Sequence, residues 1–107
     1  MAKQIGKPVR GSTTGRPIMV LFDVLGEKWT LRILWELESE PLNFRGLRER
    51  CENVSPTLLN KRLKSLRELK LVQHDEQGYS LTQEGKGLGK HLLKLNLWAE
   101  DWRSALK

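Results

Sequence analysis

Residues 43–79 read NFRGLRERCENVSPTLLNKRLKSLRELKLVQHDEQGY. The pattern predicts a short helix, a four-residue turn, a second helix over about 55–69 and a short β-hairpin, in that order. Ser55 and Pro56 form a strong helix start, because serine caps free amide groups and proline suits the first helical position. Two helices joined by a short turn, the second with a basic face, are typical of a segment that places one helix in a DNA groove.

The predicted helix over 55–69 has two different faces. Its leucines recur at helical spacing and predict a buried stripe made of Leu59, Leu63, Leu66 and Leu69. On the opposite face, one polar stripe is made of Thr57, Asn60, Lys61 and Lys64. On an isolated helix, such a stripe is more often an ordinary solvated surface. Between a turn and a hairpin, it favours contact with DNA.

The residue types in this stripe suit base recognition. An asparagine such as Asn60 can bond adenine through two atoms, and a lysine such as Lys61 can bond the acceptors of guanine. Arginine and lysine further from the helix start are better placed for phosphates, and the stem of Arg62 lies nearer the buried side. We therefore predict DNA contacts for Arg45, Ser55, Thr57, Asn60, Lys61, Arg62 and Lys64.

The flanking sequence completes a recognisable layout. Helices are predicted over 18–25, ended by Gly26, and over 29–37, stopped by Pro41. Asn43 is expected to cap the third helix, and Thr82 to cap a long last helix. The predicted fold is mainly α with a small β-hairpin, which is a winged helix-turn-helix with an extra helix at each end. We expect a flexible basic arm over 1–16 and a single domain over 17–107.

Composition limits the classes of function. The net charge is +6 over 107 residues, which favours an anionic partner. The longest apolar run, 18–22, is too short to span a membrane, and a single cysteine suits a reducing cytoplasm. The residues show no catalytic constellation and no metal-ligand spacing, so we expect neither an enzyme nor a cofactor. Cys51 lies near the negative end of its predicted helix, which favours an inert thiol.

The last helix carries a second apolar pattern. Its apolar residues alternate in steps of four and three, which gives a seven-residue repeat typical of a helix–helix interface. The alternative is that its tryptophans only close the core over the first helix. We expect a homodimer interface that contains Phe22, Leu92, Leu95, Trp98, Ala99 and Trp102. The acidic hairpin tip, Asp75-Glu76, and the tryptophans also permit a second function, a winged-helix protein-interaction module without specific DNA binding.

Four segments of the chain resemble the HxlR-type (DUF24) transcriptional regulators of bacteria and archaea. They are DVLGEKWT (23–30), PLNF (41–44), VSPTLLNKRL (54–63) and YSLTQEG (79–85). The resemblance implies a homodimeric, cytoplasmic regulator that binds specific sites in double-stranded DNA. It does not imply thiol sensing, because sensing members carry a cysteine just before the first helix and residues 11–17 contain none. The wing is also shorter than is usual in that family.

Overall fold

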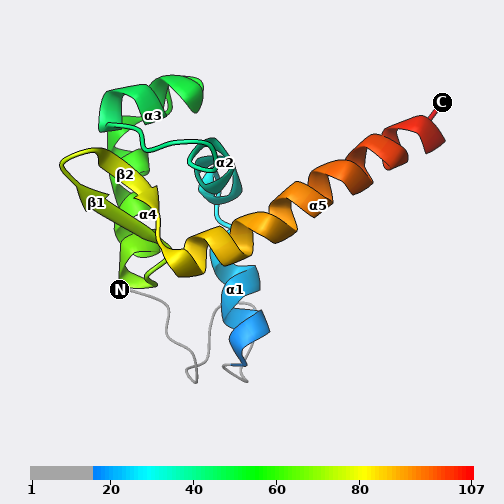
Figure 1. The fold of residues 1–107 in the computed structure, drawn as a ribbon, viewed down its shortest axis with the longest axis horizontal. Coiled ribbons are helices and arrows are strands. Elements are labelled where there is room, and N and C mark those ends of the chain that lie inside the picture. The colour runs from blue at the N-terminus through cyan, green and yellow to red at the C-terminus, as the bar shows by residue number, and fades with distance from the viewer. Residues whose placement is uncertain (1–15) are drawn as a thin grey trace.

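The computed structural model describes residues 16–107, which form five helices and one antiparallel hairpin (Figure 1). The elements are α1 (Pro17–Leu25), α2 (Thr30–Glu36), α3 (Phe44–Arg50), α4 (Pro56–Glu68), β1 (Val72–Asp75), β2 (Gly78–Leu81) and α5 (Gln83–Ala105). This order confirms the predicted fold class. The expected arm over 1–16 lies outside the described residues, apart from Arg16.

Three helices begin where the sequence predicts a cap. The side chains of Asn43, Ser55 and Thr82 accept hydrogen bonds from the backbone N–H three residues ahead, at 2.7, 3.3 and 3.0 Å. Each bond satisfies one of the amide groups that a helix start leaves without an intrahelical partner. The starts of α3, α4 and α5 are therefore fixed by local chemistry.

The start of α2 differs from the prediction by one residue. Trp29 adopts a left-handed backbone conformation with φ 76°, so the helix begins at Thr30 and not at Trp29. A positive φ is uncommon for a bulky residue. The Trp29 side chain packs against the hydrophobic core, which accounts for its position at this bend.

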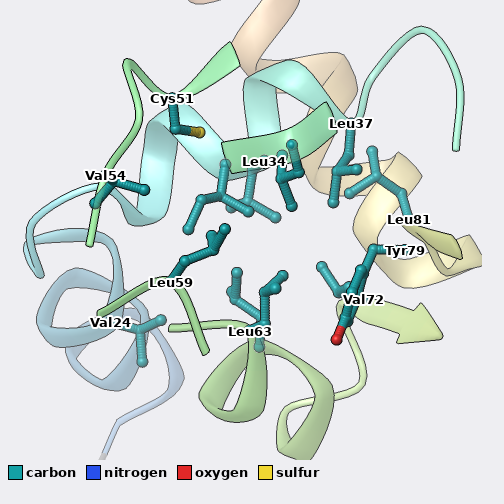
Figure 2. Packing of buried hydrophobic residues seen from close by; sticks show 13 residues of the cluster. Val24, Leu34, Leu37, Cys51, Val54, Leu59, Leu63, Val72, Tyr79 and Leu81 are labelled. Atoms are coloured by element: carbon teal, nitrogen blue, oxygen red, sulfur yellow. The ribbon is translucent and has the colours of Figure 1, made fainter. Parts of the chain in front are cut away.

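The core lies among α2, α3, α4 and the hairpin (Figure 2). Three of the four predicted α4 leucines, Leu59, Leu63 and Leu66, are buried, and Leu69 is partly buried. In Figure 2, Val72, Tyr79 and Leu81 of the hairpin approach this cluster from one side. The apolar face of α4 is therefore occupied, and its opposite face is left to solvent.

The hairpin is closed by a two-residue turn and anchored to the rest of the domain. Asp75 pairs with Gly78 at the turn, and Tyr79 exchanges two backbone hydrogen bonds with Leu42, at 2.7 and 2.9 Å. Gly78 has a φ of 109°, and a Cβ there would lie 2.5 Å from the Leu42 carbonyl oxygen. Only glycine accommodates both the conformation and the close approach.

Helix α5 crosses the domain and then leaves it. Gly85 and Gly89, one turn apart, are buried where the helix passes the backbone of Leu71 and the carboxylate of Glu38. Beyond that crossing, the helix extends away from the other elements (Figure 1). No helix in the described part of the chain is both long and apolar enough to cross a membrane.

Candidate nucleic-acid interface

The solvent face of α4 is polar and basic. Thr57, Asn60, Lys61 and Lys64 are all exposed, as the predicted stripe requires. Neither lysine forms an ion pair with another residue of the segment 16–107, so both ammonium groups are available to an anion. Ser55 caps the helix and is itself exposed, at the end of α4 where backbone amides point outward.

Arg62 lies apart from this stripe. Its guanidinium donates to the Glu27 carboxylate at 2.9 Å and to the carbonyl oxygen of Lys28 at 2.8 Å. The Arg62 and Glu27 side chains are only 13% and 16% exposed. The structure therefore does not bring Arg62 to the exposed face of α4; it uses this side chain to join α4 to the segment between α1 and α2.

Arg45 occupies the first turn of α3 and is open to solvent. Its side chain is 91% exposed, and its guanidinium lies 3.4 Å from the Glu49 carboxylate one turn further on. An exposed pair at this spacing contributes about 0.3–0.5 kcal/mol. Such a weak pair leaves Arg45 able to exchange Glu49 for a phosphate.

The tip of the wing is acidic, and part of that acidity is structural. The Asp75 carboxylate accepts the backbone N–H of Gln77 at 2.9 Å, which stabilises the turn. Glu76 beside it is exposed. On the flank of the wing, the ring of His74 stacks on that of Tyr79, with centroids 4.0 Å apart and planes within 3°.

Further exposed apolar residues lie on the terminal helices. Phe22 of α1 is 58% exposed, and Trp98 and Trp102 of α5 are 58% and 51% exposed. The two tryptophan rings stack on each other, with centroids 5.6 Å apart. Of the other residues predicted for the interface, Leu95 is exposed, whereas Leu92 and Ala99 are partly buried. An apolar groove of about 370 Å³ runs between α2 and α5, lined by Leu31, Arg32, Trp35, Leu92, Leu95, Asn96 and Ala99.

Comparison with known proteins places this arrangement in a family. The model of the HxlR-like helix-turn-helix family matches residues 24–107. The chain belongs to this family. The resemblance proposed from the four sequence segments is confirmed, and the match extends to the end of α5.

Individual relatives and solved structures are similar to this HxlR-like chain over most of its length. HTH-type transcriptional regulator MJ0925 of Methanocaldococcus jannaschii is 29% identical over 91 residues, which cover 81% of this chain and 86% of the relative. Quinone-bound YodB of Bacillus subtilis has a TM-score of 0.72 at 27% identity, covering 78% of this chain and 96% of that one. An HxlR family transcriptional factor of Thermoplasma volcanium has a TM-score of 0.70 at 28% identity, covering 81% and 84%.

Two arginines stabilise the turn between α3 and α4, a role that the sequence did not predict for them. Arg48 donates to the carbonyl oxygen of Val54 at 2.7 Å, and Arg32 donates to that of Arg50 at 2.7 Å and to the Glu52 carboxylate at 3.1 Å. The turn needs such support because Glu52 and Asn53 both have positive φ values, 57° and 58°. In the sequence, the two polar residues at 52–53 indicate a turn but do not show which side chains support it.

The cysteine of this HxlR-like chain is inaccessible. Cys51 is fully buried at the end of α3, and desolvation by burial raises the pKa of its thiol. A protonated thiol is a poor nucleophile and a poor metal ligand. Within residues 16–107, the structure also contains no group of three histidine, cysteine or acidic side chains that could hold a metal ion.

Proposed function

We propose that this HxlR-like chain is a sequence-specific DNA-binding transcriptional regulator that works as a homodimer, with α4 in the major groove. The observation that carries the proposal is the exposed stripe on α4, whose lysines have no ion-pair partner within the described residues. A stripe of this kind, on the second helix of a helix-turn-helix, is available to an anionic duplex. Membership of a family of helix-turn-helix regulators favours DNA over a purely protein partner.

The residues divide into two roles. Thr57, Asn60 and Lys61 lie in the first turns of α4, the part of a recognition helix that reaches base edges. Lys64 lies one turn beyond Asn60 and suits a phosphate. Arg45 and Ser55, near the starts of α3 and α4, also suit phosphates, because helix starts favour anions. Arg62 is omitted from this set because Glu27 and the Lys28 carbonyl oxygen engage its guanidinium.

The homodimer rests on the exposed apolar residues of the terminal helices. Trp98 and Trp102 are large aromatic residues that stand in solvent in the single chain, and aromatic residues of this kind are enriched in interfaces. Pairing would cover them together with Phe22 and Leu95. A twofold axis through this surface would present two α4 helices to half-sites about 34–36 Å apart.

DNA binding is tested by fluorescence anisotropy with genomic fragments selected for binding and with random duplexes of equal length. We expect affinity to fall with salt, with a log–log slope near −5 for about six phosphate contacts. Lys61→Ala should weaken the selected sites more than random DNA. Equal loss on both would reduce Lys61 to a phosphate contact, and a flat salt dependence would overturn DNA binding itself.

The dimer is tested by sedimentation equilibrium at micromolar concentration. We expect a dimer for the intact chain and a monomer for the double variant Trp98→Ala/Trp102→Ala. Leu97→Ala serves as the matched control, because Leu97 is at least as exposed as either tryptophan but lies more than 90° around α5 from both. A monomeric intact chain, or a dimer that survives loss of both tryptophans, would contradict this interface.

A further inference from the structure

A crevice lies at the base of the wing, between the second half of α4 and strand β1. It has a volume of about 460 Å³ and is lined by Lys64, Arg67, Glu68, Val72, Gln73 and His74. We infer that this crevice receives a backbone phosphate of the bound DNA, with Arg67 and His74 as its donors. The inference rests on the proposed function and extends it, because it gives the wing a DNA contact at its base and not at its acidic tip.

The charge in the crevice is available to a ligand. Lys64 and Arg67 are exposed, and neither forms an ion pair with any described residue, whereas Arg62 on the same helix is held by Glu27. The carboxylate of Glu68 is also exposed and offsets one of the two cations. A planar guanidinium without a protein partner presents up to five N–H groups, which suit two oxygens of one phosphate.

His74 supplies the opposite wall of the crevice. Its ring is oriented by stacking on Tyr79, which is itself buried in the core. A neutral imidazole still carries one N–H donor, so the contact does not require a second proton on the ring. Gln73 beside it donates to the Ser80 hydroxyl at 3.3 Å, which directs one of its two amide N–H groups along the hairpin and not into the crevice.

The distance along α4 suits this assignment. Arg67 lies seven residues beyond Asn60, which corresponds to about 10 Å of rise along the helix. The major groove is about 12 Å wide and 8.5 Å deep. When Asn60 is at the base edges, Arg67 is therefore near the mouth of the groove, where the phosphates lie. The wing tip extends beyond this point and carries Glu76, which a phosphate would repel.

The test compares Arg67→Gln and His74→Phe with the intact chain on a selected operator. Phenylalanine keeps an aromatic ring on Tyr79 and removes the ring N–H. We expect about tenfold weaker binding for Arg67→Gln, about fivefold for His74→Phe, and a salt slope smaller by about one unit for Arg67→Gln. The control is Lys107→Gln, which removes the same charge from the exposed end of α5 and should leave both quantities unchanged.

A second measurement identifies the phosphate. Neutral methylphosphonate linkages are placed one at a time along the operator, and at one position we expect the intact chain and Arg67→Gln to bind equally. The inference would be overturned if no linkage position made the two affinities equal. It would also be overturned if both variants kept the affinity and the salt slope of the intact chain. A crevice that binds inorganic phosphate while neither variant changes DNA affinity would likewise overturn it and assign a free anion. Failure of the intact chain to bind any duplex would instead refute the proposed function.

Discussion

The contrast between Arg62 and its neighbour Lys61 gives the sharpest test of how α4 is used. The two residues are adjacent and both basic, yet one is held by Glu27 and the other is exposed without an ion-pair partner among residues 16–107. We consider Arg62→Met and Lys61→Met. Methionine keeps an unbranched apolar stem of similar reach and removes the charge in both cases.

The expected cost of Arg62→Met follows from its two contacts. The guanidinium donates at 2.9 Å to a carboxylate and at 2.8 Å to a carbonyl oxygen, in a site where the two side chains are 13% and 16% exposed. A fully buried pair broken on one side costs about 3–5 kcal/mol, and residual exposure reduces this to about 2 kcal/mol. For a domain of this size, that corresponds to a melting temperature lower by about 10 °C.

The assay combines thermal unfolding with DNA binding well below the melting temperature. For Arg62→Met we expect the loss of stability, a DNA affinity within about twofold of the intact chain and an unchanged salt slope. For Lys61→Met we expect a stability change within about 0.5 kcal/mol and about tenfold weaker binding to selected sites. The double variant with Glu27→Gln should cost less than the sum of the single changes.

One result would refute the reasoning. If Arg62→Met melts within about 2 °C of the intact chain, binds DNA about tenfold more weakly and loses about one unit of salt slope, then Arg62 contacts phosphate and the Glu27 pair contributes little. The expectation derived from the sequence alone would then hold for this residue. Circular dichroism before each titration confirms that the compared proteins are folded.

Two further predictions concern glycine and cysteine. Gly85→Ala should destabilise the domain by about 2 kcal/mol or more, because a Cβ would overlap the Leu71 carbonyl oxygen, whereas Gly87→Ala should stabilise it by about 0.5–1 kcal/mol, since nothing lies within 4 Å. Urea unfolding measures both, and equal effects would contradict the close approach. Burial raises the pKa of Cys51 in the folded chain, so its contribution is present below about pH 8.5 and is lost as pH rises through the raised value, by at most about 1.4 kcal/mol per pH unit. The difference in unfolding free energy between the intact chain and Cys51→Ala should therefore shrink above that pH, and a constant difference would refute the assignment.

The features predictable from the sequence are those that local chemistry determines. A cap depends on residues three positions apart, so Asn43, Ser55 and Thr82 could be assigned as helix starts without a structure. The exposed stripe and the buried leucines of α4 likewise follow from helical periodicity alone. Both kinds of pattern also underlie the family resemblance.

The features that could not be predicted depend on distant contacts. Arg62 meets Glu27 across 35 residues, and no local rule separates it from the exposed Lys61 beside it. Gly85 and Gly89 weaken a helix by propensity alone, and only the approach of Leu71 and Glu38 explains their presence. The left-handed Trp29 similarly depends on the core against which its side chain packs.

The acidity of the wing tip has a structural cause as well. Asp75 accepts the Gln77 N–H, and Gly78 must lie close to Leu42, so two of the four residues at the turn are set by the domain's own geometry. An aspartate in that position stabilises the turn whether or not DNA is present. The tip therefore carries negative charge for a structural reason, and we expect the phosphate contacts at Arg45, at the exposed cations of α4 and at the base of the wing. Glu76 forms no such bond within the described residues. Its replacement by glutamine should therefore strengthen DNA binding if the tip approaches a phosphate. Unchanged affinity would place the tip beyond the DNA backbone.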